Sequence, residues 1–192
     1  KHMTTEQLRH RMPPILKALK ERSLRGRTPV EGLRRTECAY HGWDTVHADA
    51  ASWEPFAPGD AFGGLEAHHC FKGTVTLPEA SAGKRVVCLV STGASDIWNN
   101  NNPQFLAYVD GRLVCGLDVN HNEFDLAACA VPGESHELAL YVYCNTPARD
   151  VFLRVETAER DDDVTGLYYD LRAPYEVCAL LADDDTRAIG IM

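Results

Sequence analysis

The stretch NNPQFLAYVDGRLVCGLDVNHNEFDL, residues 101–126, carries the clearest fold signal in the chain. Apolar side chains alternate over 105–109, an Asp-Gly pair follows at 110–111, and 112–115 runs back. Because Asp-Gly readily adopts the positive φ angles of a tight turn, this pattern predicts a β-hairpin. The polar segment 117–123 comes next, between two apolar runs, and we expect its many donors and acceptors to face a ligand or a protein surface.

The rest of the chain predicts a mainly β protein. Short strand-like segments recur at roughly ten-residue spacing, without the alternation of strands and helices that marks a parallel sheet. The predicted strands cover 33–40, 71–77, 85–91, 137–143 and 151–157, besides the hairpin. We therefore expect an antiparallel β-sandwich, jelly-roll-like, with short N-terminal and C-terminal helices.

The predicted domain organisation has three parts. Residues 1–34 form an N-terminal basic helix and linker, 35–165 the β-sandwich, and 166–192 a helical lead-in to a further domain. Lys1 and His2 precede Met3 and are interpreted as a tag remnant.

Prolines and acidic residues set the expected limits of the helices. Pro13-Pro14 should interrupt the first helix, and 26–32 should be a loop. A short C-terminal helix should begin near Pro174, after a solvated turn at 161–163.

Composition excludes several classes of protein. A hydrophobic content of 45% over 192 residues suffices for a core, and no apolar run reaches the roughly 18 residues of a membrane span. The seven cysteines are odd in number and include no CxxC. We interpret them as small buried side chains of a cytoplasmic protein, with a metal or disulfide framework as the alternative.

Charge is distributed unevenly along the chain. Residues 1–36 contain ten Lys and Arg against three Asp and Glu, whereas 37–192 contain nine against 25. A basic arm on an acidic body suggests docking on an acidic surface of this chain or a neighbour. No aromatic residues interleave with the basic ones and no nucleic-acid-binding signature is present, so we expect no nucleic-acid partner.

Motifs for catalysis and metal binding are mostly lacking. The sequence has no HExxH, GxSxG, P-loop or Rossmann fingerprint. Asp118, Asn120 and Asn122 match the start of a calcium loop, but Glu123 replaces the required glycine and Cys129 the final carboxylate.

Histidines and paired carboxylates give no stronger signal. His68 and His69 should point to opposite faces of a strand and cannot easily share a metal. Asp118 and Glu123 have the residue types of a glycosidase pair, but nothing around them marks one as an acid with a raised pKa.

Two groups of residues are candidates for contacts with sugar or with another domain. Trp98 stands before four asparagines, and an indole face with amides beside it can bind a pyranose; the alternative is a polar loop with Trp98 turned inward. His121 is open to three interpretations: a hydrogen-bonded core residue, an interface group or a sugar contact. The candidates for substrate binding or a domain interface are Asp118, Asn120, His121, Trp98 and Asn102.

Several segments of the chain resemble a known family. They are Phe71-Lys72-Gly73-Thr74-Val75, Leu77-Pro78, Gly83-Lys84, Asn102-Pro103-Gln104, Tyr108-Val109-Asp110-Gly111, Gly116-Leu117-Asp118-Val119-Asn120-His121 and Leu167-Tyr168-Tyr169-Asp170-Leu171. In this order they resemble the N-terminal domain of the cytosolic or vacuolar type of α-mannosidase, glycoside hydrolase family 38. The likeness covers roughly residues 35–185, and Cys115 and Asn122 depart from it.

The resemblance implies a retaining hydrolase of terminal α-mannosides. In that family zinc or another divalent metal is bound by histidines and aspartates of a separate α/β domain, which also supplies the aspartate nucleophile. The present sequence has no HxHxD motif, so no catalytic or metal-binding residue is carried over.

The expected function is therefore that of a non-catalytic domain that packs on the catalytic domain of the same polypeptide. Other subunits of a homo-oligomer and a mannoside ligand are further expected partners. The alternative is a carbohydrate-binding module that acts alone, and a free-standing enzyme is the third class considered.

Aromatic residues at 43, 53, 56 and 62 should anchor a long ordered loop onto the core.

Overall fold

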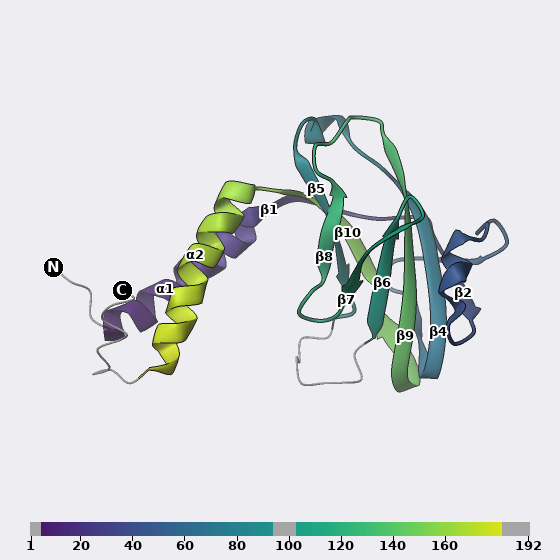
Figure 1. The fold of residues 1–192 in the computed structure, drawn as a ribbon, viewed down its shortest axis with the longest axis horizontal. Helices are drawn as coiled ribbons and strands as arrows, with labels where there is room; N and C mark the ends of the chain where they lie inside the picture. The colour runs from purple at the N-terminus through teal and green to yellow at the C-terminus, as the bar shows by residue number, and fades with distance from the viewer. Residues whose placement is uncertain (1–4, 94–102, 182–192) are drawn as a thin grey trace. The chain divides into compact units, whose positions relative to one another are not determined.

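A computed structural model describes residues 5–93 and 103–181 of the chain. Two antiparallel sheets form a β-sandwich, and one helix precedes and one follows them in the sequence (Figure 1). The predicted fold class is confirmed. The chain divides into two compact units, of which Gly26–Glu159 is the sandwich and the other contains both helices.

The elements and their order in the sheets are as follows. The helices are α1 (Thr5–Ser23) and α2 (Asp162–Leu180), and the 3-10 helices are η1 (Gly42–His47) and η2 (Glu79–Ser81). The strands are β1 (Leu24–Pro29), β2 (Leu33–Cys38), β3 (Glu54–Phe56), β4 (Ala61–Thr76), β5 (Arg85–Ser91), β6 (Gln104–Val109), β7 (Arg112–Leu117), β8 (Glu123–Ala127), β9 (Ser135–Phe152) and β10 (Arg154–Arg160). One sheet has the order β1-β10-β5-β8 and the other β3-β2-β4-β9-β6-β7.

One expectation about strands is wrong, and two predicted strands have other bounds. The segment expected to be a loop at 26–32 contains most of β1, which pairs with β10 at the edge of the four-stranded sheet. The strand predicted at 137–143 is part of the longer β9, and the strand predicted at 151–157 begins later, as β10. Since β9 pairs with β4 from Thr76↔Ser135 to Ala61↔Phe152, the backbone ladder keeps it extended where the sequence loses its alternation.

The sandwich core lies between the sheets and contains a group of three packed phenylalanines. Phe71 is fully buried, and its ring centroid lies 4.9 Å from that of Phe56 and 5.1 Å from that of Phe62, edge to face. Phe56 and Phe62 are buried as well, so the loop between β2 and β4 is anchored as predicted. Trp53 is also buried, whereas Trp43 is 40% exposed.

A second apolar cluster covers the outer face of the six-stranded sheet. There η1 and the following loop pack Val46 and Trp53 on Cys70, Tyr108 and Tyr141. This layer uses the strand positions that alternate with the inward-facing core residues.

The buried Lys72 and the half-buried Arg34 hold the loop that follows η1 by donating hydrogen bonds to its backbone carbonyl groups. Lys72 Nζ donates to the Ala48 carbonyl at 2.9 Å, and Arg34 donates to the carbonyls of Ala51 and Trp53 at 3.2 and 2.8 Å. Lys72 also lies 3.0 Å from the Glu137 carboxylate. The loop is thus fixed on the sheet by charge-assisted hydrogen bonds.

The predicted hairpin turn is confirmed, and its aspartate joins the turn to β9. Asp110 and Gly111 have φ angles of 51° and 73°. The Asp110 carboxylate accepts hydrogen bonds from His136 Nδ1 at 2.8 Å and from the Glu137 backbone N–H at 2.9 Å. The bond from His136 is the main cause that lowers the pKa of Asp110, and the Glu137 N–H and the Arg112 charge act in the same direction.

Asp110→Asn should remove a pH-dependent part of the stability, because Asn-Gly preserves the turn but carries no charge. A carboxyl whose folded pKa is lowered stabilises the fold above its unfolded pKa of about 3.9, and the effect disappears as the pH falls through the folded pKa. The difference in unfolding free energy between wild type and variant should therefore be full near neutral pH and shrink below about pH 4. Urea unfolding at stepped pH measures it, and a difference independent of pH would count against this role.

Helix α1 runs without a break, so the predicted interruption at Pro13-Pro14 is wrong. Both prolines are exposed, where water can solvate the backbone around them. The buried side of α1 recurs at helical spacing through Met12 and Ser23, and it packs against α2. Tertiary packing on this side outweighs the local proline signal.

Helix α2 is likewise one helix rather than a turn followed by a short helix that begins at Pro174. Asp161 caps it by accepting a hydrogen bond from the Val164 N–H at 3.1 Å, so the expected solvated turn is the helix start. Thr165, Tyr168 and Cys178 are its buried residues. The Asp161 N–H bonds to the Ser23 carbonyl, which joins the start of α2 to the end of α1.

Candidate functional site

The polar segment after β7 forms a turn at the edge of the sandwich. β7 is the last strand of one sheet and β8 the last strand of the other, so Asp118–Asn122 crosses between the two sheets. Asp118 accepts hydrogen bonds from the backbone N–H groups of Asn120 and His121 at 2.7 and 2.8 Å, and the Asp118 N–H donates to the His121 carbonyl.

Backbone N–H groups of the turn bind the Asp118 carboxylate, and the His121 side chain faces solvent. The His121 side chain is 82% exposed, with Nδ1 3.4 Å from the Asp118 carboxylate, which excludes the core interpretation of His121. The backbone hydrogen bond from His121 is the first cause that lowers the pKa of Asp118, so Asp118 is an ionised acceptor and a poor general acid. Asn120 is exposed as well. Of the five predicted site residues, the structure brings together these three, and Trp98 and Asn102 lie outside the described residues.

A different group of residues, which the sequence did not bring together, gathers on the outer face of the six-stranded sheet. We call it the aromatic surface: Tyr40, His41, Trp43, Glu66, His68, Tyr141 and Tyr143. Tyr40 and His41 lie just before η1 and Trp43 lies in it, whereas β4 supplies the next two residues and β9 the last two. Register explains the assembly, because His68 of β4 pairs directly with Tyr143 of β9.

The rings of the aromatic surface form a connected set with solvent access. Tyr40 is 71% exposed, and its ring lies 3.7 Å from that of His41 and 5.5 Å from that of His68, centroid to centroid. The Trp43 ring meets that of Tyr141 edge-on at 6.4 Å. The exposed rings, held against the sheet by their neighbours, offer flat apolar area that costs little to desolvate.

Polar groups border these rings. The Tyr141 hydroxyl lies 2.7 Å from His68 Nδ1, and the Tyr143 hydroxyl donates to Glu66 at 3.3 Å. Burial, together with the Glu66 carboxylate, raises the pKa of Tyr143, so its phenol stays a hydrogen-bond donor at neutral pH. The aromatic surface therefore combines apolar faces with donors and a carboxylate acceptor.

Backbone strain coincides with this surface. His41 and Glu66 have φ angles of 58° and 56°, and Asp110 of the hairpin is the third non-glycine residue with positive φ in the described ranges. The β4–β9 register also shifts twice, between Phe62 and Gly64 and between Leu65 and Ala67. Bulges and left-handed residues re-aim side chains and are enriched at functional sites.

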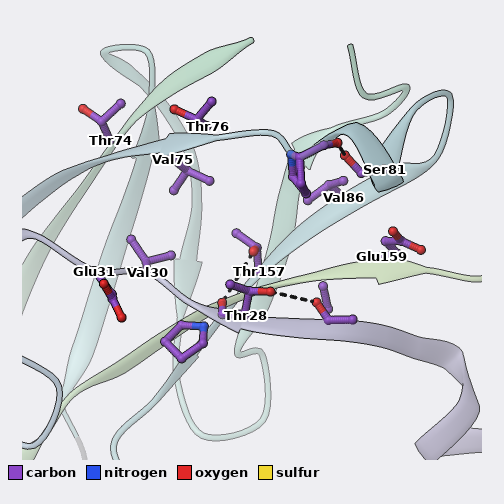
Figure 2. Close-up of a pocket in the computed structure, with 14 residues that line it drawn as sticks. Thr28, Val30, Glu31, Thr74, Val75, Thr76, Ser81, Val86, Thr157 and Glu159 are labelled. Atoms are coloured by element: carbon purple, nitrogen blue, oxygen red, sulfur yellow. Dashed lines mark hydrogen bonds between the residues drawn. The ribbon is translucent and has the colours of Figure 1, made fainter. Parts of the chain in front are cut away.

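A cavity of about 500 Å³ opens between β1, β4, the start of β5 and β10 (Figure 2). Its hydroxyl groups bond to nearby backbone, as Thr28 does to the Gly26 carbonyl at 3.2 Å and Ser81 to the Pro78 carbonyl at 2.7 Å. Glu159 is paired with Lys84 at 2.7 Å. Its lining, within the described part of the chain, includes no aromatic side chain, so it fits a sugar less well than the aromatic surface does.

Within 5–93 and 103–181 no three His, Cys, Asp or Glu side chains gather in a way that could hold a metal ion. His68 and His69 do point to opposite faces, since His69 Nε2 contacts the Gly63 carbonyl inside the sandwich. Neither α1 nor α2 has the length and apolar character needed to cross a bilayer.

The sequence matches no protein-family model and no curated protein. Solved structures with a similar fold include the β-glucuronidase of Ruminococcus gnavus, at 8% identity and a TM-score of 0.51, over 70% of this chain and 29% of that one. The β-glucuronidase of Faecalibacterium prausnitzii is 13% identical with a TM-score of 0.46, over 71% of this chain and 32% of that one. The chain thus spans under a third of these proteins, and the likeness to the first shows a shared β-sandwich fold.

Proposed function

We propose that this chain is a non-catalytic β-sandwich domain of a glycoside hydrolase of the α-mannosidase type that its sequence resembles. Its role is to pack on the catalytic domain and support one side of the substrate cleft. The catalytic domain then supplies the divalent metal and the nucleophile, and the sandwich supplies a rigid surface.

The edge turn is the observation that supports this proposal. The segment Gly116–His121 carries the most specific part of the resemblance, and it joins the two sheets at an exposed edge. Asp118 fixes the turn internally, which leaves the His121 ring extended into solvent. A fixed turn with a projecting imidazole is suited to contact a second domain.

The test of this role is an activity assay with 4-nitrophenyl α-mannoside. The 192-residue chain should release no nitrophenol with zinc or cobalt added, whereas the longer product of the same reading frame should. A 4-nitrophenyl β-glucuronide serves as the control substrate and should be inert to both. Release of nitrophenol by the 192-residue chain, or cleavage of only the glucuronide by the longer product, would overturn the proposal.

Saccharide binding by this domain is the second candidate function, and the aromatic surface favours it. Exposed Tyr40 and Trp43 rings can cover the apolar face of a pyranose while Glu66 and Tyr143 bond its hydroxyls. The sequence indicated Trp98 for this role, and Trp98 lies outside the described residues.

Titration calorimetry with mannose and short α-mannosides tests this second function. We expect a Kd below about 1 mM, roughly −4 kcal/mol, that Tyr40→Ala and Trp43→Ala weaken at least about tenfold. Leu113→Ala changes an apolar side chain on β7 whose exposure lies between those of Tyr40 and Trp43, and it should leave binding unchanged. Absence of binding, or binding lost only in Trp98→Ala, would reject the aromatic surface as the site.

A further inference from the structure

Two cysteines on neighbouring strands lie close enough to react with each other. Cys38 ends β2 and Cys70 lies in β4, and their Sγ atoms are 3.7 Å apart. In the β2–β4 register Cys70 pairs with Thr36 and Cys38 with His68, so the cysteines are diagonal neighbours on the outer face of the sheet. A disulfide has an S–S length of about 2.05 Å, so the sulfurs must approach by under about 2 Å.

The strand end that carries Cys38 is placed to make this movement. β3 pairs with β2 only over Leu33–Arg35, so the backbone at Cys38 is bonded on one side alone. The chain turns directly after β2, through His41 in the left-handed region and Gly42. A Cβ at Gly42 would lie 3.2 Å from Cys38 Cβ, so glycine leaves the room in which the Cys38 side chain sits.

The two thiols differ in the way that stepwise oxidation requires. Cys38 is half-buried and therefore reachable by a small oxidant, whereas Cys70 is fully buried. The hydrogen bond from Cys70 lowers the pKa of Cys38, and that same bond, with burial, raises the pKa of Cys70. Cys38 is thus the better thiolate nucleophile, and Cys70 keeps its proton until it reacts.

We propose that Cys38 and Cys70 form a dithiol site that hydroperoxides oxidise to a disulfide. The Cys38 thiolate attacks a peroxide oxygen, so that an S–O bond forms, the O–O bond breaks, and the leaving hydroxide or alkoxide takes up a proton. The Cys70 sulfur then displaces the sulfenic hydroxyl, which leaves as water with the Cys70 proton. Two thiols are oxidised, one peroxide is reduced, and a dithiol reductant reverses the change.

The disulfide would fix the beginning of the loop that supplies three residues of the aromatic surface. Tyr40, His41 and Trp43 follow Cys38 directly, and β4 supplies Glu66 and His68 just before Cys70. A cross-link between the two strands restricts the end of β2 that leads into this loop. Oxidation should therefore slow proteolysis and hydrogen exchange at 39–47, independently of whether the chain binds sugar.

Peroxide treatment of the full chain, followed by alkylation and peptide mapping, tests the site. Of the seven free cysteines, Cys38 and Cys70 should disappear together from the alkylated pool and reappear as one linked peptide pair. Dithiothreitol should restore both. Residues 39–47 should show slower hydrogen exchange in the oxidised protein and should return to the original rate after reduction.

Cysteine variants test whether oxidation depends on the Cys38–Cys70 pair or only on the solvent exposure of a thiol. Cys129 is the exposed cysteine, and Cys129→Ser should leave formation of the pair intact. Cys70→Ala should trap Cys38 as a sulfenic acid that dimedone labels, and Cys38→Ser should leave Cys70 reduced. Modification of Cys129 alone, or oxidation of Cys38 in wild type without loss of Cys70, would overturn the proposal, and the wild-type mapping decides it even if Cys70→Ala fails to fold.

Discussion

Phe71→Ala should lower the free energy of unfolding by about 3–5 kcal/mol, the largest effect expected of any single change in the sandwich. Phe71 is fully buried, and its ring packs edge to face against those of both Phe56 and Phe62. Alanine would remove this ring and leave a cavity lined by both neighbours. Urea denaturation followed by far-UV circular dichroism measures the loss.

Two further variants test whether that loss of stability comes from the buried apolar volume of Phe71. Phe71→Leu keeps most of the apolar volume and should recover more than half of it. Leu113→Ala removes a side chain that is 58% exposed and should stay within about 0.5 kcal/mol of wild type. Equal effects of Phe71→Ala and Leu113→Ala would contradict a core centred on the phenylalanines.

Lys72→Met should destabilise the protein by about 2–3 kcal/mol and loosen the loop on the outer sheet face. The Lys72 side chain is 9% exposed, and its ammonium holds the Ala48 carbonyl and the Glu137 carboxylate. Methionine keeps the apolar stem but leaves that carbonyl without its donor. Hydrogen exchange should rise over 42–53 more than elsewhere, and urea unfolding gives the total.

A matched change on a surface ion pair provides the control. Lys84 is paired with Glu159 at 2.7 Å but is half exposed, so Lys84→Met should have an effect below about 1 kcal/mol. Equal effects of the two methionine variants would show that burial of Lys72 does not matter. Unchanged exchange over 42–53 in Lys72→Met would show that the loop is held by its apolar contacts alone.

The sequence predicted the elements in which local chemistry and tertiary structure agree. The Asp-Gly turn, the apolar run of β5 and the alternating start of the central hairpin each have one favourable backbone conformation, and each appears where expected. The elements that were wrong depend on partners far away in the sequence. Pro13 and Pro14 stay helical because α1 packs on α2, and β9 stays extended because β4 does.

The candidate sites also divide into one that local sequence predicts and one that depends on distant strands. Asp118 and His121 are close in sequence, so their turn could be anticipated from spacing. The aromatic surface is built from three segments, 40–43, 66–68 and 141–143, which meet only through strand register. Aromatic residues at 40 and 43 were visible in the sequence, but nothing local distinguishes a ring that anchors a loop from one that faces water.

The pairing of α1 with α2, and of β1 with β10, has a consequence for biosynthesis. These partners are separated by nearly the whole described chain, so α1 and β1 leave the ribosome long before theirs do. Contacts of this length slow folding and leave the side of α1 that carries Met12 uncovered during translation. The nascent chain should therefore depend on chaperones that shield α1 until residues beyond 160 have emerged.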